Sequence, residues 1–554
     1  MRGIVVACLC VVGSLFVVSS ARAGDYIRDL QMTAITSHRG DFGHWGPDPA
    51  NYRLWGTHSN RLIPVYTFGT LNGGAEIDLK SFLGSNSPYR KEEQLQRIYG
   101  RVPTATVDNT AEFMDQTNLF QLQLAALKSG RKNIFLVIFD GMDWQTTRAA
   151  SIYKTQRIAY QAGRGTGLHF QDYMANGTSQ FGFMCTSPHN AGTKFNVNTQ
   201  TVLNPGGTLL GGYNISLGGP NPWTPGNDLL YPIAKNVGGK VMHAYTDSSS
   251  SATSMTAGIK TYNNAVNVDY AGNPVTTIAH IAQEQGYAVG AVSSVPISHA
   301  TPAATYAHNV DRDDYQDLTR DMLGLKSISH PTNSLPGLDV VIGGGAGHIR
   351  NKDSNKVSEE DPGNNFVPGN AYLTEDDLQA VDSRHGGKYV TSIRSTGVNG
   401  SQALRAASKQ AADTGKRFLA MYGNGKYSGH LPFATADGDF RPTLGRKDTA
   451  EAYQEADLFE NPTLSDMAAA AITVLSKNPK GFWLMVEPGD VDWANHDNNI
   501  DNSIGAVLSG DAAVKTITDW VEQHSNWSES LLIVTADHGH YLVIEKPELL
   551  IAPK

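Results

Sequence analysis

Two short segments near the end of the sequence combine carboxylates with imidazoles, the side chains that bind divalent metal ions in proteins. In "VEPGDVDWANH", Asp492 and His496 stand four residues apart, so on a helical turn they share a face. In "TADHGH", an aspartate and two histidines directly follow an apolar run. Any one of these residues alone is more often a surface carboxylate or a hydrogen-bonded core histidine, but two mixed clusters together predict a metal centre. The candidate ligands are Glu487, Asp492, His496, Asp537, His538 and His540.

A third segment, "HAYTDSSSSATSMTAGIKTYN", places four serines behind Asp247. It has no proline and reaches Gly258, so it predicts a helix that begins near the serines and ends at a glycine cap. Free N–H groups and the positive end of the helix dipole favour an anion at that position. Two interpretations remain open from this run alone: a serine-rich helix cap without chemistry, or a serine that attacks a bound phosphate.

Apolar runs that end in polar residues must position these groups. The first, "NIFLVIFDGMD", ends at Asp140 and has the pattern of a buried parallel strand. Because ligands bind at the carboxyl ends of such strands, the runs point to one shared site. They predict an α/β protein with a mostly parallel central sheet sandwiched by helices. The other runs are "YAVGAVSS", "LDVVIGGG", "GFWLMVEPGD" and "SLLIVTADHGH".

Composition narrows the class of protein. Hydrophobic residues make up 40% of the 554 residues and charged residues 18%, which predicts a packed globular chain. A net charge of -9 argues against nucleic acid as the main partner, since phosphate backbones are bound by an excess of Lys and Arg.

The N-terminal segment has the features of a signal peptide. An apolar run follows Arg2, and "ARA" at Ala21–Ala23 suits cleavage, so we expect a signal over 1–23 and one mature catalytic domain over 24–554. A retained membrane anchor is the alternative; no later segment predicts a transmembrane span. The expected location is periplasmic or secreted. Cys185 is the one cysteine outside the signal, so no internal disulfide is expected. Irregular stretches near 178–228 and 351–370 are interpreted as surface insertions.

Several of these motifs together resemble the alkaline phosphatase family. The resemblance covers most of the mature chain and includes "DGM" at Asp140–Met142 and the serine segment through "GIKTYN". It continues with "SHATPAATYAHNVDRDDY", "VEPGDVDWANH" and "TADHGH". It implies a phosphomonoesterase with an alkaline-phosphatase-like fold, two Zn²⁺ ions and one Mg²⁺ ion. Family members are often homodimers, so a homodimer is expected.

The resemblance also implies a role for each matching residue. Ser248 would be the nucleophile, with zinc lowering the pKa of its hydroxyl, and Arg312 would grip the phosphate. Asp140, Asp537 and His538 would bind that zinc, and Asp492 and His496 the second. Thr301 and Glu487 would bind magnesium, with Asp140 bridging. His540 would orient a metal ligand. His299 and Trp493 stand at positions that vary in the family and adjoin the magnesium site and the phosphate pocket.

Two rival functions remain. One is another hydrolase of the same superfamily, a phosphodiesterase or a sulfatase. Sulfatases use a cysteine-based nucleophile motif, however, and no cysteine lies near Ser248; diesterases typically lack the third metal site. The other rival is a metal- or phosphate-binding relative without catalysis. Such a protein should have lost a ligand or the nucleophile, whereas the matching motif positions carry suitable residues here.

The third ligand of the second zinc departs from the family pattern. In the family it is a histidine well after the "DHxH" motif, and no histidine follows His540 here. The segment "WGTHSNRLIPVYTFG", with His58, resembles the missing one: a histidine in a polar turn, a strand and a glycine. We therefore predict that His58 completes the site and that the chain is circularly permuted. The alternatives are His430, His38 or His44, or a site with only two protein ligands.

Overall fold

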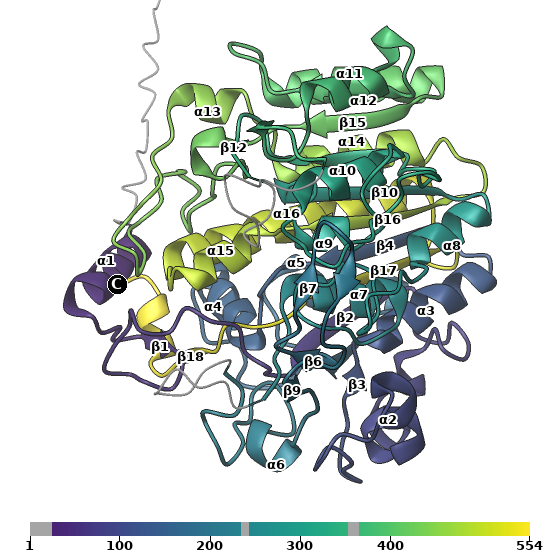
Figure 1. Cartoon of the computed structure of the whole chain (residues 1–554). Coiled ribbons are helices and arrows are strands. Elements are labelled where there is room, and N and C mark those ends of the chain that lie inside the picture. Colours follow the sequence, from purple (N-terminus) through teal and green to yellow (C-terminus); the bar gives the residue numbers. More distant parts are fainter. Residues whose placement is uncertain (1–24, 234–242, 353–364, 554) are drawn as a thin grey trace, which may run out of the picture.

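A ten-stranded sheet runs through the middle of the part of the chain that the computed structural model describes, residues 25–233, 243–352 and 365–553 (Figure 1). The expected signal peptide lies outside these residues. The sheet begins with seven strands that all run parallel to one another. In spatial order they are β14 (Tyr389–Ile393), β15 (Arg417–Met421), β11 (Val340–Gly344), β10 (Ala288–Pro296), β16 (Phe482–Glu487), β4 (Asn133–Ile138) and β17 (Ser530–Thr535).

Three further strands extend the sheet beyond β17. β2 (Ile63–Phe68) pairs antiparallel with β17 and with β5 (Gln180–Cys185), and β3 (Met114–Asp115) forms the edge beside β5. Because β2 runs against β17, the beginning of β2 lies at the carboxyl end of β17. The chain that precedes β2 therefore reaches the edge where the parallel strands end.

The mostly parallel α/β class predicted from the sequence is confirmed. The five apolar runs form β4, β10, β11, β16 and β17, which are adjacent in the sheet. Every residue of these strands is buried. A strand covered on both faces has no solvent side, which is why these runs are continuously apolar and do not alternate.

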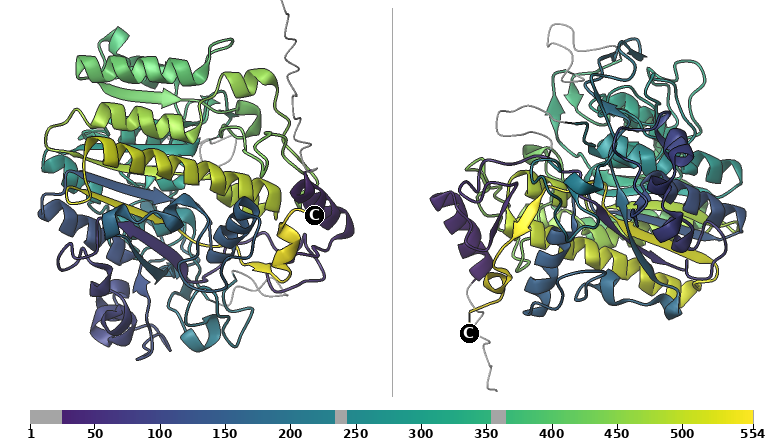
Figure 2. Two further views of the ribbon diagram at one scale, coloured as in Figure 1. Left: turned by 180° about the vertical axis from the view of Figure 1, so that it is seen from behind. Right: turned by 90° about the horizontal axis from the view of Figure 1, so that it is seen from below.

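Helices cover both faces of the sheet. One face carries α7 (Ser248–Ala257) with its neighbours, and the opposite face carries α16 (Ile500–His524). The left view of Figure 2, in which the molecule is seen from behind, has α16 in front of the sheet. One continuous hydrophobic cluster joins the sheet to both layers. The other helices near α7 are α3 (Thr117–Lys128), α8 (Ile278–Glu284), α9 (Ala300–Ala303) and α10 (Tyr315–Leu323); those near α16 are α4 (Trp144–Thr155), α12 (Gly400–Thr414) and α14 (Leu464–Leu475).

The stretch expected as an insertion over 178–228 begins inside the sheet, because residues 180–184 pair with β2 as part of β5. After Cys185, which is buried and free, the chain forms turns and short two-stranded ladders. Of the second stretch, the ends are described, and β13 (Gly369–Asn370) pairs with β12 (Ile349–Arg350). None of the described helices is both long enough and apolar enough to cross a bilayer.

Candidate metal centre

Four parallel strands deliver polar side chains to one edge of the sheet. Ser293 in β10 and Glu487 at the end of β16 are directly paired. Asp140 and Asp537 each follow, by two residues, a pair in register at the ends of β4 and β17. All four side chains are buried. Three carboxylates thus lie together in the interior, an arrangement that is costly unless cations balance it.

Ser248 shares one point of this edge with Asp140, Asp537 and His538. Nε2 of His538 lies 3.3 Å from Oδ1 of Asp140 and 3.4 Å from Oδ2 of Asp537. Oγ of Ser248 lies 3.4 Å from Oδ1 of Asp140 and 3.4 Å from Nε2 of His538. A tetrahedral zinc with bonds of about 2.0–2.1 Å separates its ligand atoms by about 3.3 Å. Ser248, Asp140 and His538 therefore have the spacing of three ligands of one zinc ion, and Asp537 lies beside His538. A carboxylate oxygen of Asp492 also lies within 4.8 Å of the donor atoms of Asp140 and His538.

A second group of donors surrounds Asp492, which lies with His496 on α15 (Asp490–His496). Oδ1 of Asp492 lies 3.5 Å from Nε2 of His496 and 3.7 Å from Nε2 of His58. The two histidine Nε2 atoms are 3.0 Å apart. The sequence predicted that Asp492 and His496 share one helical face and that His58 lies beside them, and the structure brings the three side chains together.

The hydrogen bonds of these histidines indicate what lies between them. Nδ1 of His58 is 3.1 Å from the carbonyl of Thr246, and Nδ1 of His496 is 2.9 Å from that of Gly56. A carbonyl only accepts, so both Nδ1 atoms carry hydrogen and both Nε2 lone pairs face each other. Burial lowers the pKa of both imidazoles, that of His58 well below its ordinary value, which opposes protonation. Two facing lone pairs at this distance fit a shared metal ion.

Strand pairing explains why His58 reaches this point. β2 starts at the carboxyl end of β17, and the backbone N–H of Ser59 donates to the carbonyl of Gly539 at 2.7 Å. The turn that carries His58 is therefore bonded to the loop that carries His538.

The other three histidines considered for this role lie elsewhere. Nε2 of His430 is 2.8 Å from the carboxylate of Glu451. His44 lies 3.7 Å from Glu545, and His38 lies 3.3 Å from Arg53. Of the four candidate histidines, all of them among the described residues, only His58 joins the group around Asp492.

His540 binds Asp492 directly. Its Nε2 lies 2.6 Å from Oδ1 of Asp492, so the imidazole donates to the carboxylate. The same nitrogen cannot bind a metal while it donates, so in this geometry His540 orients Asp492. Burial alone would raise the pKa of Asp492, but the imidazoles of His496, His540 and His538 hold it well below its usual range.

The expected magnesium ligands provide oxygen atoms without partners. Oδ2 of Asp140, Oγ1 of Thr301 and Oε1 of Glu487 are buried and have no hydrogen-bond partner among the described residues. Thr301 lies in α9, against the end of β10. Burial raises the pKa of Glu487 to about 8, although the Ser293 hydroxyl opposes this; burial and the neighbouring Asp537 raise that of Asp140. An all-oxygen set of this kind suits Mg²⁺.

The helix predicted after the serine run is confirmed as α7, which ends at Gly258 with φ 72°. The carboxylate of Asp247 caps it by accepting the N–H of Ser250 at 3.0 Å. The four serines point in different directions because helical neighbours are rotated by about 100°. Only Ser248 among them contacts Asp140 and His538. The hydroxyls of the others bond to Asp247, to Thr246 and to the carbonyl of Asp537.

Asp247 also binds Arg312, a contact that the sequence motifs did not indicate. NH1 of Arg312 lies 3.3 Å from Oδ2 of Asp247, which also accepts the N–H of Asn264 at 2.9 Å. Burial would lower the pKa of Arg312, but Asp247 raises it above the ordinary value, so the guanidinium stays charged. The position of Asp247 just before the serine helix indicated its role as a helix cap. No feature of the local sequence indicated its contact with Arg312.

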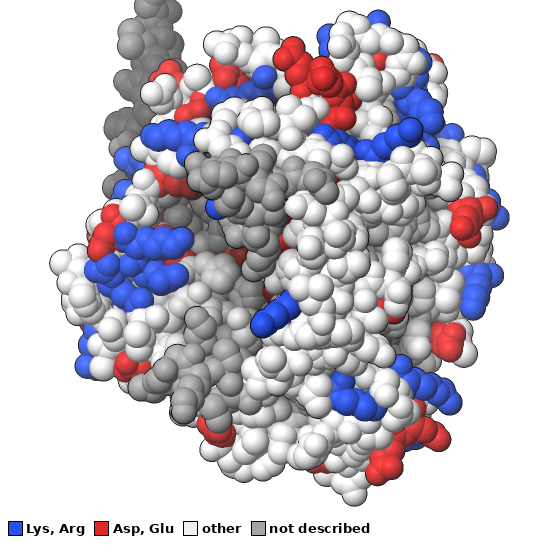
Figure 3. All heavy atoms as spheres, viewed as in Figure 1, with Lys and Arg blue, Asp and Glu red and all other residues white. Residues whose placement is uncertain are grey.

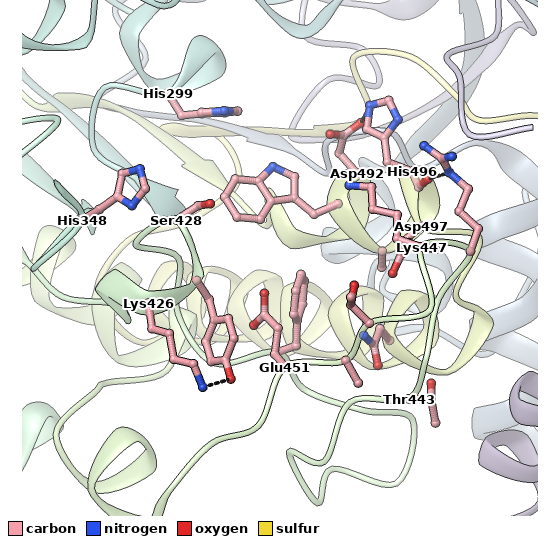
Figure 4. Close-up of a pocket in the computed structure, with 18 of the residues that line it drawn as sticks. His299, His348, Lys426, Ser428, Thr443, Lys447, Glu451, Asp492, His496 and Asp497 are labelled. Atoms are coloured by element: carbon pink, nitrogen blue, oxygen red, sulfur yellow. Dashed lines mark hydrogen bonds and ion pairs between the residues drawn. The ribbon is translucent and has the colours of Figure 1, made fainter. Parts of the chain in front are cut away.

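A cavity of about 750 Å³ is lined by Asp492, His496 and Arg312. Figure 4 shows Asp492 and His496 among the residues that line this cavity. His299 and Trp493 line it with their rings 5.6 Å apart, and burial together with Arg312 lowers the pKa of His299 to about 3. Basic side chains outnumber acidic ones in the lining. In Figure 3, Lys and Arg form several separate groups on this face of the molecule, with acidic groups between them. The basic lining residues are Arg312, Arg350, Lys426, Arg446 and Lys447.

Comparisons with known proteins identify the family of this chain. The model of the alkaline phosphatase family matches residues 231–549. Alkaline phosphatase 4 of Bacillus subtilis is 30% identical over 325 residues, covering 57% of this chain and 55% of the relative. The alkaline phosphatase of Escherichia fergusonii is 31% identical over 306 residues, covering 55% and 60%. This chain spans about half the length of the curated relatives it matches. The crystal structure of the Thermus thermophilus alkaline phosphatase aligns over 74% of this chain and 60% of its own, at 22% identity and a TM-score of 0.43.

Proposed function

The chain belongs to the alkaline phosphatase family, and on that premise we propose that it hydrolyses phosphate monoesters through a phosphoserine formed on Ser248. One observation carries the proposal. Oγ of Ser248 stands at the N-terminus of α7, 3.4 Å from both Asp140 and His538, and the adjacent Asp247 holds Arg312. Nucleophile, metal donors and phosphate-binding arginine thus meet at one place.

The donor sets described above fit two zinc ions and one magnesium ion. Asp140, Asp537 and His538 would hold the zinc beside Ser248. Asp492, His496 and His58 would hold the second zinc, and Asp140, Thr301 and Glu487 the magnesium. When bound, these ions lower the pKa of the serine hydroxyl and of a water and balance the charge of the reacting phosphate.

The protein groups then divide the reaction into two displacements. Oγ of Ser248 attacks phosphorus, an O–P bond forms to the serine, and the bond to the ester oxygen breaks so that the alcohol leaves. Water next displaces Ser248 from phosphorus and releases phosphate. Arg312 can donate to two non-bridging oxygens in both steps, because its guanidinium presents paired N–H groups.

We also propose that the order of segments is permuted relative to the family. The histidine that the family places after the "DHxH" motif is supplied here by His58, from a segment ahead of Ser248. Its support is the position of His58 beside His496 and the pairing of β2 with β17. The family match begins at residue 231, so the segment with His58 lies outside it.

A comparison of substrates tests the reaction class. Turnover of an aryl phosphate monoester is expected to exceed that of a bis-aryl diester. The buried oxygens of Asp140, Thr301 and Glu487 fit a third metal ion, and diesterases typically lack that third site. Faster turnover of the diester would favour a phosphodiesterase. No release of phosphate from either ester would favour a binding protein without catalysis.

Removal of the metal ions is expected to abolish activity. A chelator should inactivate the enzyme, and zinc together with magnesium should restore it, since the buried carboxylates and imidazoles would act through the ions that they hold. Activity should be higher at mildly alkaline than at neutral pH, because deprotonation of the serine and of the attacking water is favoured as pH rises. Rates measured across pH, with and without chelator, check both points; activity that survives full chelation would contradict the metal mechanism.

Replacing Arg312 with lysine is expected to weaken binding of substrate and phosphate by about 1–3 kcal/mol. The charge remains, but the paired N–H donors are lost. The inhibition constant of inorganic phosphate measures this directly. Arg405→Lys is a matched control, because Arg405 is exposed on α12. Unchanged phosphate inhibition in Arg312→Lys would remove Arg312 from the phosphate pocket.

A further inference from the structure

A further cluster of histidine and aspartate side chains lies away from the sheet edge that carries Ser248 and the metal donors around it, here called the catalytic edge. A ring nitrogen of His308, a carboxylate oxygen of Asp321 and a ring nitrogen of His330 lie within 4.8 Å of one another. His308 precedes α10, Asp321 lies within it, and His330 follows it. None of the three belongs to the catalytic donor sets.

Asp321 is the centre of this cluster and is fully buried. Its Oδ2 accepts the backbone N–H of His308 at 3.0 Å. Its Oδ1 accepts the hydroxyl of Ser327 at 2.5 Å and lies 2.9 Å from Nδ1 of His330. The carboxylate is therefore held in place by its surroundings, as expected of a metal ligand with supporting contacts.

His308 offers a free lone pair in this position. Its Nε2 donates to the carbonyl of Val275 at 2.9 Å, so Nδ1 is the unprotonated nitrogen. His308 is 7% exposed, and its Nδ1 is buried without a hydrogen-bond partner among the described residues. An unpartnered polar atom inside a protein is unusual and calls for an explanation.

We propose that His308, Asp321 and His330 bind a divalent transition-metal ion, with Zn²⁺ as the ion that two imidazoles and a carboxylate suit best. The ion takes the lone pair of His308 and replaces the proton that His330 now shares with Asp321. Burial lowers the pKa of His308, so no proton competes there at neutral pH.

The cluster is also accessible. The side chain of His330 is 16% exposed. A cavity of about 270 Å³ beside His308 is lined by His280, whose ring stacks on that of His308 at 5.3 Å. His330, the partly exposed member, is therefore the donor through which a cation would reach the cluster.

Such an ion would act on the segment that carries Arg312. His308 and Asp321 stand on either side of this arginine in the sequence, and the metal would join the two ends. The site would thus position the arginine segment without contacting substrate. The proposal stands on its own geometry and does not depend on the reaction at Ser248.

Anomalous X-ray scattering tests the site without any mutation. Crystals of the full chain soaked in zinc chloride are measured above and below the zinc absorption edge. We expect a peak between His308, Asp321 and His330, separate from those at the catalytic edge. Peaks at the catalytic edge with none at this cluster would overturn the proposal.

Zinc content provides the second measurement. After dialysis against dilute zinc, His330→Ala should retain one equivalent of zinc less than wild type. Inductively coupled plasma mass spectrometry measures this zinc content. His385→Ala is the matched control, because His385 is exposed on the surface and lies outside the cluster. Equal zinc content in His330→Ala and wild type would contradict the site.

Discussion

Replacing Ser248 with alanine is expected to lower kcat/KM for an aryl phosphate at least about a thousandfold, or about 4 kcal/mol. The change removes the oxygen that lies 3.4 Å from Asp140 and from His538, and the other serines of α7 point elsewhere. The fold should survive, since the Ser248 hydroxyl has no backbone partner among the described contacts. Steady-state kinetics and circular dichroism check the two parts of this prediction.

The three neighbouring serines are its internal controls. Ser249→Ala, Ser250→Ala and Ser251→Ala should each stay within about tenfold of wild type. Their hydroxyls support Asp247, Thr246 and the backbone of Asp537, so their loss affects positioning and leaves the nucleophile in place. If Ser249→Ala were as inactive as Ser248→Ala, the assignment of the nucleophile would be wrong.

Replacing His58 with alanine is expected to remove most activity and one zinc ion per chain. Asp492 and His496 alone would leave the second site with two protein ligands, whereas catalytic zinc sites usually have three. Zinc content and kcat/KM measured on the same preparation test this prediction. Added zinc should not restore the wild-type stoichiometry at micromolar concentrations.

His430→Ala is the matched control for that experiment. His430 is buried and bonded to Glu451, so its loss should cost stability but leave the zinc content unchanged. The opposite pattern, with zinc lost from His430→Ala and retained in His58→Ala, would show that His430 is the third ligand. It would also remove the main support for a permuted chain.

Much of the sheet was predictable because its strands are marked locally. A continuous apolar run that ends in a polar residue is typical of a parallel strand buried on both faces, and β4, β10, β11, β16 and β17 all have this pattern. β5 was not recognised, since Gln180 and Gly182 interrupt its apolar character and the stretch continues into turns. Its place in the sheet depends on pairing with β2, which is distant in the sequence.

The site residues also divide into those that a local motif places together and those that only long-range packing brings together. Residues within one motif, such as Asp492 and His496, were placed together by their helical spacing. The contact between Asp247 and Arg312 and that between Ser293 and Glu487 join segments far apart in the chain. No spacing rule predicts them, because they depend on how the strands and helices pack.

Trapping the phosphorylated intermediate tests the role of Ser248 most directly. The protein is mixed with a phosphate monoester, quenched in acid and digested, and its phosphopeptides are sequenced by mass spectrometry. We expect phosphate on Ser248, in the peptide that begins the α7 helix, and none in the Ser248→Ala variant. Phosphate on another residue, or continued turnover in Ser248→Ala, would contradict this role.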